Sequence, residues 1–305
     1  MVDPLAEVVG LLQLTAEYSK RVGFAGRWRV RRTEVGQPFY FAILEGACRL
    51  EVDGHEAIVL LADDFVLIPS AKDFTMTSVE PPLESDEAYD CVPVAQPDGS
   101  YRLGIQEGPT DTVALVGNGV SASPDASLLY SLLPRLVHVR HEKRLATLVQ
   151  LVRDEVRAQR PAREVILARL LEVVFIEALR SSGTEASPGL MRGLADVRLG
   201  QAIRRMHAQP GERWTVAQLA KAAALSRSAF FERFSREVGV APMEYLLSWR
   251  MALAKNFLRN EDGGIAVIAQ RVGYSSASAF SVAFTRYVGL APTHYAQQQV
   301  TARPA

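Results

Sequence analysis

The chain has little of what secreted, membrane-spanning or disulfide-built proteins need. Its 305 residues include two cysteines, Cys48 and Cys91, which are too few for a fold held together by disulfides. No apolar run approaches the ~20 residues that cross a bilayer. Asp3 and Glu7 stand where a secretory signal would be basic or apolar. The sequence therefore predicts a cytoplasmic protein that makes no use of a membrane.

Histidine is also scarce, and this limits the metal chemistry open to the chain. Five histidines are present, none of them in a His-x-His pair, and His55 lies beside a glycine in a predicted hairpin turn. The sequence has no Ser–His–Asp set, no paired acidic motif and no glycine-rich phosphate loop. We therefore predict that the protein is not an enzyme and that it holds neither a metal nor a cofactor.

The net charge is zero, but the two signs are unevenly distributed along the chain. Residues 1–193 contain 20 Lys and Arg against 27 Asp and Glu, whereas residues 194–305 contain 14 against 7. A basic segment joined to an acidic one is what attraction to a phosphate backbone requires. Chance segregation of solvated charge is the alternative explanation.

The basic segment contains one sequence module twice. Residues 216–245 align with residues 266–295. The offset between matching positions is 49 before a short turn and 50 after it. Each copy predicts a helix, a tight turn and a second helix, the arrangement that inserts a helix into a DNA groove. A long helix predicted over residues 242–259 joins the copies and fixes their separation. The aligned pairs are Ala220 with Ala269, Phe230 with Phe280, Phe234 with Phe284, Gly239 with Gly289, Pro242 with Pro292, and Tyr245 with Tyr295.

Local signals set the boundaries of these two motifs. Thr215 and Ser226 are typical N-cap residues, and Gly239 stands just past the end of the second helix of the first copy. We therefore predict two helix-turn-helix motifs, over residues 215–238 and 265–287. Two such units on one polypeptide indicate a protein that reads double-stranded DNA.

The acidic segment begins with short strands. Between residues 27 and 116, apolar stretches such as 39–44 and 65–68 alternate with turn signals such as Glu45-Gly46 and Asp53-Gly54. Many short strands at a spacing of roughly ten residues are typical of a sandwich or small barrel. Residues 141–159 and 162–180 then have apolar residues at helical spacing. This helical pair either covers the barrel or forms a dimer interface, and the sequence leaves both open.

A composition change separates the two segments. Residues 181–193, SSGTEASPGLMRG, have the glycine, serine and proline content of a linker. The predicted fold class is therefore α+β with two domains. Residues 1–180 form a β barrel with a helical pair, and residues 194–305 form an all-α domain with two helix-turn-helix motifs.

Residues 197–297 resemble the AraC/XylS family of bacterial transcription regulators. The resemblance lies in stretches such as SRSAFFERFSREVGVAPMEYLLSWRMALA and IAVIAQRVGYSSASAFSVAFTRYVGLAP. It implies that two reading helices enter neighbouring major grooves about one helical turn (~34 Å) apart. It further implies a sequence-specific regulator, usually an activator, that contacts RNA polymerase.

The acidic segment resembles the cupin-type sensor domain found in one branch of that family. Residues 46–74, GACRLEVDGHEAIVLLADDFVLIPSAKDF, carry the resemblance, and ALVGNGV and LLYSLLPRLVHVR fit its later part. The resemblance implies a jelly-roll barrel that senses a small effector, and a homodimer formed through helices 141–180. Where relatives of this kind often have histidine, the chain has Tyr40 or Phe41 and Phe74, which argues against a cupin enzyme fused to a DNA-binding module.

The DNA contacts follow in part from which residues are buried. If Phe230 and Phe234 face the core, the opposite side of their helix faces DNA. The same is expected of the corresponding helix in the second copy. The family often has Arg at the positions of Glu232 and Val282, so the second helix offers little base readout here. Ala296 follows Tyr295 where the family commonly has Arg. The expected base-facing residues are Arg227, Ser228, Phe231, Glu232, Ala277, Ser278, Ser281 and Val282, and the expected phosphate contacts are Lys221, Arg233, Arg236, Arg271 and Arg286.

Two sites in the acidic segment remain hypotheses. Four phenylalanines, Phe39, Phe41, Phe65 and Phe74, are candidates for an effector pocket, with simple barrel core as the alternative. Cys48 and Cys91 would form a redox switch if the fold brought their Cα atoms within about 6 Å. A thiol-based redox regulator is therefore the rival to an effector-sensing one, with buried inert thiols as the simpler reading.

Overall fold

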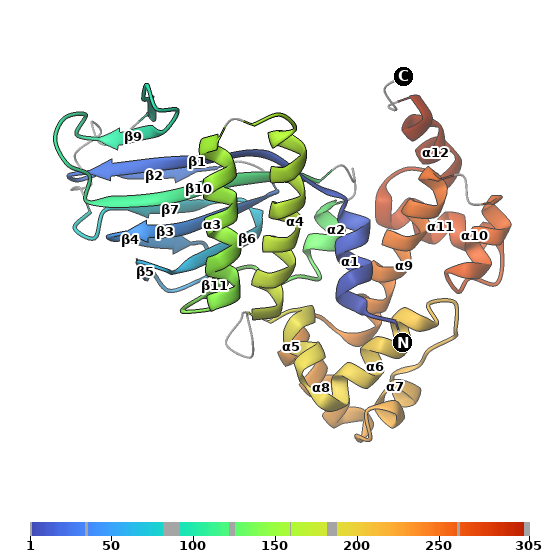
Figure 1. Cartoon of the computed structure of the whole chain (residues 1–305). Coiled ribbons are helices and arrows are strands. Elements are labelled where there is room, and N and C mark those ends of the chain that lie inside the picture. The colour runs from blue at the N-terminus through green and yellow to red at the C-terminus, as the bar shows by residue number, and fades with distance from the viewer. Residues whose placement is uncertain are drawn as a thin grey trace. The chain divides into compact units, whose positions relative to one another are not determined.

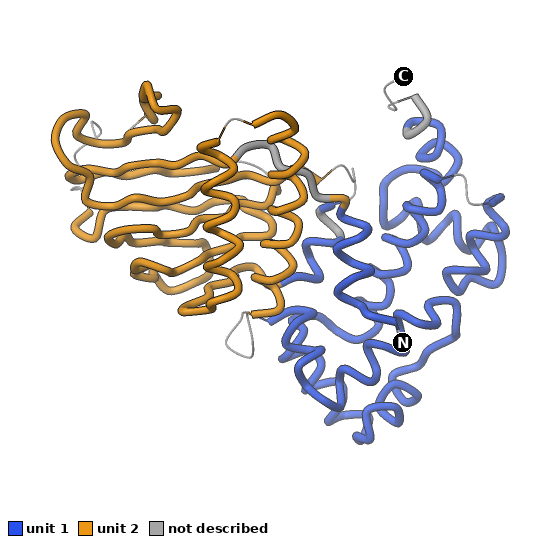
Figure 2. Tube along the Cα trace, in the orientation of Figure 1, with its two compact units in different colours: residues 1–12, 125–133, 188–305 blue, residues 13–124, 134–187 orange. Residues whose placement is uncertain are grey.

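The computed structural model of the chain contains two compact units (Figure 2). The sheet unit comprises residues 13–124 and 134–187, and the helical unit comprises residues 1–12, 125–133 and 188–305. No helix in the described part of the chain combines the length and apolar character needed to cross a bilayer. The described residues are 2–33, 36–81, 92–121, 126–158, 160–181, 188–260 and 263–301.

The sheet unit is built from two sheets that enclose one apolar core. Within the described residues, seven strands pair in the order β11-β6-β3-β10-β1-β9-β8 and four in the order β2-β7-β4-β5. The pairs formed by these described strands are antiparallel except β1 with β9. The strands are β1 (Leu14–Ala25), β2 (Arg29–Arg32), β3 (Gln37–Glu45), β4 (Ala47–Val52), β5 (Ile58–Leu61), β6 (Phe65–Ala71), β7 (Phe74–Thr77), β8 (Val94–Ala95), β9 (Tyr101–Gly104), β10 (Thr112–Ser121) and β11 (Val137–Val139).

Large side chains fill the space between the two sheets. Trp28 is fully buried and its ring centroid lies 4.2 Å from that of Phe24. Along β3 the side chains of Phe39, Phe41 and Ile43 join this core, as the period of two in a strand requires. The sandwich interior is therefore packed with protein.

Helices α3 (Lys143–Ala158) and α4 (Arg163–Ser181) lie across the outer face of the seven-stranded sheet (Figure 1). Leu145, Val149 and Val152 are the buried apolar residues of α3, and α4 contacts β1, β6 and β11. The helical pair therefore covers the sheet, which is one of the two roles that the sequence left open. The sandwich and the helices that cover it confirm the predicted α+β class.

The helical unit includes a segment that we expected to belong with the sheet. Helix α1 buries Leu5, Val8, Val9 and Leu12, and it packs against α2 and α6. The predicted domain of residues 1–180 is therefore not one unit, because this apolar face is covered by helices. The helices of the unit are α1 (Pro4–Leu12), α2 (Ala126–Tyr130), α5 (Leu190–Ala195), α6 (Val197–Ala208), α7 (Val216–Ala222), α8 (Arg227–Val238), α9 (Pro242–Arg259), α10 (Ile265–Arg271), α11 (Ala277–Val288) and α12 (Pro292–Thr301).

The predicted linker over residues 181–193 differs from the structure at both ends. Ser181 is the last residue of α4, and residues 182–187 lie outside the described part. From Leu190 the chain is helical and packed: the Leu190 side chain is fully buried, and its N–H donates to the Leu132 carbonyl at 2.8 Å. A Cβ on Gly193 would stand 2.7 Å from Ile203 and Val238. Its glycine thus serves close packing in α5, where we expected a flexible joint.

Candidate nucleic-acid interface

Helices α7 and α8 form the first motif, and each begins at a side-chain cap. Thr215 and Gln218 make a reciprocal capping box at the start of α7. The Ser226 hydroxyl accepts the Ala229 N–H at 3.3 Å at the start of α8. Between the helices Ala224 has a φ of 51°, the left-handed conformation that turns the chain sharply.

Helices α10 and α11 repeat this arrangement. The Ser276 hydroxyl accepts the Ala279 N–H at 3.1 Å, and Gly273 takes the left-handed turn position with a φ of 88°. In both copies the turn closes through a backbone bond at the equivalent place, from Leu225 to Ala220 and from Tyr274 to Ala269. The extra residue of the second copy therefore lies after the turn and before the cap of α11.

The aromatic core of each motif has the same geometry. Phe230 and Phe234 have ring centroids 5.5 Å apart at 51°, and so have Phe280 and Phe284. Tyr245 then meets Phe234 at 5.7 Å and 74°, and its counterpart meets Phe284 at 5.6 Å and 72°. The duplication seen in the sequence is thus a duplication of side-chain packing, which fixes how each reading helix sits on its support.

The packing leaves one side of each reading helix facing solvent. In α8, Phe231 is 46% exposed, and in α11 Val282 is 71% exposed. Ser281 has its hydroxyl directed to the Ala277 carbonyl at 2.8 Å, within its own helix. The other expected base-facing residues are exposed, except Ala277, which is half-buried: Arg227, Ser228, Glu232 and Ser278.

The expected phosphate contacts do not all remain available. The Arg233 guanidinium is bound to Asp196, the residue that caps α6. Although burial opposes it, backbone bonds and Arg233 hold the pKa of Asp196 below its usual value. Arg236 pairs with Glu237 at 2.9 Å, and the Arg271 guanidinium lies 3.7 Å from the centroid of the Phe257 ring. The remaining two, Lys221 and Arg286, are exposed.

Arg250, on the joining helix α9, links the two motifs, and it is not among the residues predicted from the sequence. Its Nε donates to the Pro210 carbonyl at 2.7 Å and its Nη2 to the Glu212 carbonyl at 2.6 Å. Burial lowers the pKa of this guanidinium from its ordinary value, against an opposing contribution from Tyr274. The only sequence signal was a cation next to Trp249 in an otherwise apolar stretch.

The loop held by Arg250 also touches the second motif. A Cβ on Gly211 would stand 3.0 Å from the Arg271 carbonyl oxygen, and one on Gly273 would stand 2.5 Å from the Arg250 guanidinium. The loop ahead of the first motif therefore packs directly against the turn of the second. Together with α9, this contact fixes the position of one reading helix relative to the other.

A buried histidine connects α1 to the support of the first motif. His207 Nδ1 lies 2.8 Å from the Glu7 carboxylate, and Nε2 lies 2.7 Å from the Tyr245 hydroxyl. Burial lowers the pKa of His207, and it outweighs the Glu7 bond and charge and the Asp3 charge, which raise that pKa. Burial also raises the pKa of Tyr245, so that the hydroxyl keeps its proton and donates a hydrogen bond to Nε2. The histidine is therefore neutral, with its proton on Nδ1.

We expect this histidine to make the helical unit sensitive to acid. Because its folded pKa lies below that of the unfolded chain, stability is full above about pH 6.5 and falls as the pH drops toward the folded pKa. Urea unfolding at several pH values should show this loss in the wild type. His207→Gln, which cannot be protonated, should remove that part of the pH dependence. Parallel pH profiles for the two proteins would contradict the assignment.

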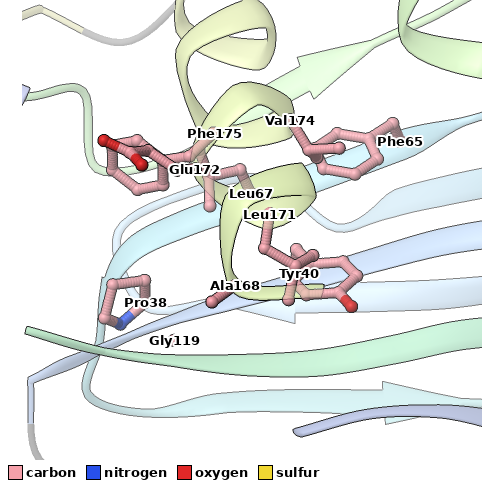
Figure 3. A pocket seen from close by; sticks show the side chains of 10 residues that line it. All are labelled: Pro38, Tyr40, Phe65, Leu67, Gly119, Ala168, Leu171, Glu172, Val174 and Phe175. Atoms are coloured by element: carbon pink, nitrogen blue, oxygen red, sulfur yellow. The ribbon is translucent and has the colours of Figure 1, made fainter. Parts of the chain in front are cut away.

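In the sheet unit, the four candidate phenylalanines do not share one pocket. Phe39 and Phe74 have ring centroids 4.6 Å apart beside a cavity of only about 10 Å³, and Phe41 is part of the packed core. Phe65 points the other way, toward α4 (Figure 3), because on β6 its neighbour Val66 takes the inward position. The predicted effector pocket is thus wrong in its grouping of Phe65 with the other three.

Cys48 lies in an environment that suppresses thiol chemistry. Its side chain is fully buried, and burial, with a smaller effect of the Asp64 charge, raises the pKa of the thiol to about 12. A thiolate is the reactive form, so this cysteine is inert near neutral pH. Cys91 lies outside the described residues. Among those that are described, no three His, Cys, Asp or Glu residues gather where they could hold a metal ion.

Comparisons with known proteins match two parts of the chain to two different family models. A cupin family model matches residues 3–182, and a helix-turn-helix domain model matches residues 219–298. A putative AraC-like transcription regulator of Streptomyces lividans is 36% identical over 96% of this chain and 97% of its own length. The transcriptional regulator AlkR of Acinetobacter baylyi is 27% identical over 97% of this chain and 99% of its own.

Solved structures are also similar. The DNA-binding domain of AdpA, crystallised with a target DNA, is 28% identical and covers 34% of this chain and 95% of its own, with a TM-score of 0.33. ToxT of Vibrio cholerae is 15% identical and covers 93% of this chain and 98% of its own, with a TM-score of 0.36.

Proposed function

The chain belongs to the family of AraC-like transcription regulators, and from that premise we propose how it reads DNA and responds to a signal. It is a DNA-binding regulator with a cupin-type first domain. Helices α8 and α11 enter consecutive major grooves on one face of the duplex. The protein works in the cytoplasm as an activator that contacts RNA polymerase, and it catalyses no reaction. The observation that carries the proposal is the duplicated motif with its repeated aromatic core.

The two reading helices contribute unequally to sequence recognition. On α8, Arg227 can donate two bonds to guanine and Glu232 can accept one from cytosine. On α11, Val282 can only contact a thymine methyl, and the Ser281 hydroxyl is already directed to its own backbone. The α8 half-site therefore carries most of the specificity, and α11 contributes mainly affinity.

Phosphate contacts come from exposed cations around both motifs. Lys221 and Arg286 are the best placed, and Arg236 and Arg271 can turn from their present contacts to DNA. Arg233 is the weakest candidate because Asp196 holds it. Such contacts position the protein and make binding sensitive to salt, without reading sequence.

Genomic fragments retained by the purified full-length protein test this function. Sequencing them gives the operator, and an operator duplex should bind at least ~10³-fold more tightly than a scrambled one at physiological salt. The logarithm of the affinity should fall linearly with the logarithm of salt concentration. Absence of salt-sensitive binding to any duplex would refute the proposal.

Replacing one reading residue and one phosphate contact separates their roles. Arg227→Ala should lower affinity for the operator by about tenfold or more and relax the preference at one base pair. Lys221→Ala should weaken binding to operator and scrambled duplex alike, and reduce the salt dependence by about one counterion. Fluorescence anisotropy on both duplexes measures this. If Arg227→Ala weakens both duplexes equally, α8 does not read bases at that position.

We further propose that the protein is a homodimer formed through the solvent-facing side of α4. Ile166 and Val173, seven residues apart, are both 42% exposed there, and Val165 is 64% exposed. Apolar side chains two turns apart on one helical face suit a helix-to-helix interface. Two copies would place four reading helices on one operator.

Charged substitutions on that face should separate the dimer. Ile166→Glu with Val173→Glu places carboxylates in the proposed interface, and sedimentation should then show a monomer at concentrations where the wild type is a dimer. Val59→Glu is the matched control, since Val59 is 43% exposed on β5, in the other sheet. Equal sedimentation of wild type and double variant would mean that α4 is not the interface.

A further inference from the structure

The two reading helices are held near their C-terminal ends by different partners, although their aromatic cores repeat. Glu237 stands in the last turn of α8, and the equivalent residue of α11, 50 positions further on, is Tyr287. Glu237 binds α5, whereas the Tyr287 hydroxyl lies 2.7 Å from the Ser248 hydroxyl of α9. The repeat therefore ends at this position, and each reading helix has its own support.

Arg192 of α5 binds Glu237 through two nitrogens. Its Nε donates to one carboxylate oxygen at 3.0 Å, and its Nη2 donates to the same oxygen. The two side chains are 26% and 17% exposed, so salt screens this pair less than a surface pair. Although burial opposes it, Arg236 and Arg192 hold the pKa of Glu237 below its usual value. Glu237 is therefore a carboxylate near neutral pH, with an arginine on each of its oxygens.

Further contacts join α5 to the same part of α8. The Gly189 N–H donates to the Glu237 carbonyl at 3.0 Å. A Cβ on Gly193 would stand 2.7 Å from a side chain of α8, so the two helices are in close contact. Past the end of α5, Asp196 binds Arg233, one turn before Glu237. The last turns of α8 are therefore packed on α5 and on the residue that follows it.

Helix α5 is itself fixed. Leu190 is fully buried, and its N–H donates to the Leu132 carbonyl at 2.8 Å. Leu132 follows α2, whose helix packs against the joining helix α9. Because α5 is bound at its start by Leu132 and at its end through Asp196, it can hold α8 at a fixed angle to the rest of the helical unit.

The length of α8 amplifies any movement at its supported end. Arg227 stands ten residues before Glu237, which is about 15 Å along the helix axis. A tilt of about 4° at Glu237 therefore displaces Arg227 by about 1 Å. Specific contacts need their geometry to within about 0.5 Å, whereas phosphate contacts carry no sequence information. A loosened support should thus lower discrimination between bases more than it lowers general affinity.

We propose that Arg192 and Glu237 are positioning residues for DNA recognition and that they act on the half-site read by α8. This role rests on the proposed function, since α8 must read bases for its angle to matter. It adds a specificity determinant that lies on α5, outside both helix-turn-helix motifs. The Tyr287 and Ser248 pair has the corresponding place behind α11.

Arg192→Met tests this role in the full-length protein with two duplexes, the operator and an operator whose α8 half-site is scrambled. That half-site is the one in which Arg227→Ala relaxes the base preference. We expect the ratio of the two affinities to fall by about tenfold in Arg192→Met, measured by fluorescence anisotropy. The lost charge alone weakens both duplexes alike, because phosphate contacts do not depend on sequence, so the ratio isolates positioning.

Ser248→Ala is the matched control, because it removes the support of α11 and leaves α5 intact. Its affinity ratio should equal that of the wild type. Arg192→Lys keeps the charge but cannot bind through a planar fork, and it should restore part of the ratio. An unchanged ratio in Arg192→Met, or an equal fall in Ser248→Ala, would overturn the positioning role.

Amide hydrogen exchange of the free protein tests the support without DNA. Arg192→Met should speed exchange in the last turns of α8 by about tenfold and leave α11 unchanged, and Ser248→Ala should do the reverse. If Arg192→Met does not fold, Glu237→Gln replaces it in both experiments and should show smaller changes in the same direction. Unchanged exchange in α8 would mean that α5 does not support it, and the role would be wrong.

The wild type separates a failure of this role from a failure of the proposed function. If it prefers the operator to the scrambled duplex but the ratio does not respond to Arg192→Met, only the positioning role is wrong. If the wild type binds no duplex, the proposed function is wrong, and the positioning role is wrong with it.

Discussion

Phe230→Ala should destabilise the helical unit by about 3–5 kcal/mol, whereas Phe231→Ala should change stability by less than about 1 kcal/mol. The two residues are neighbours on α8, but Phe230 is fully buried and Phe231 is 46% exposed. Truncating Phe230 leaves a cavity against Phe234, whose ring centroid is 5.5 Å away. The two variants therefore distinguish the buried face of α8 from its solvent-exposed face.

For DNA binding we expect Phe231 to matter through direct contact, whereas for stability Phe230 matters more. Phe231→Ala removes an apolar contact to a base edge and should lower operator affinity by about tenfold in a protein that stays folded. Thermal unfolding and amide hydrogen exchange of α8 measure the first effect, and anisotropy with the operator duplex measures the second. Comparable losses of stability in the two variants would show that α8 does not present these faces as described.

The second large effect concerns the turn of each motif. Gly273→Ala should destabilise the helical unit by about 2–4 kcal/mol, since an alanine at a positive φ is strained and its Cβ would displace a guanidinium. That Cβ would stand 2.5 Å from Arg250 Nη2, which is held by the Glu212 carbonyl. Ala224→Gly at the equivalent position, where φ is 51°, should instead stabilise by up to about 1 kcal/mol.

Disturbing Arg250 should also alter the reading of DNA. Because Arg250 fixes the loop that packs on the second motif, Gly273→Ala and Arg250→Met should both relax the required spacing between half-sites. An operator with one extra base pair between half-sites should be rejected by the wild type and tolerated better by the variants, relative to the unaltered operator. Thermal unfolding of the Gly273→Ala and Ala224→Gly variants measures the two stability changes predicted above. If Ala224→Gly is less stable than the wild type, the comparison of the two turns is wrong.

The parts of the fold that could be predicted are those that depend on local pattern. Ser226 and Gly239 mark the ends of α8 as expected, because caps act on backbone groups within a turn of helix. The duplication also made the burial of Phe280 predictable from that of Phe230. Such features require no knowledge of distant parts of the chain.

The features that were missed depend on distant contacts. Residues 65–68 are apolar at every position because both faces of β6 are covered, so alternation does not tell which side of the strand Phe65 takes. Arg233 is held by Asp196, 37 residues away, which charge patterning does not reveal. Helix α1 joins a unit whose other members follow more than a hundred residues later.

Helix α1 and the short α2 segment have a consequence for how the protein can be divided. The backbone passes from one unit to the other at residues 12–13, 124–125, 133–134 and 187–188. Cleaving the stretch after α4 therefore cuts only the last of these covalent crossings. A fragment that starts at Val197 would lack α1 and α2. It would therefore expose the apolar surfaces of α6 and α9 that these helices cover, and it would leave His207 without the Glu7 carboxylate. A fragment cut out after α4 would therefore be a destabilised DNA-binding domain. Stability and DNA affinity are better measured on variants of the full-length protein.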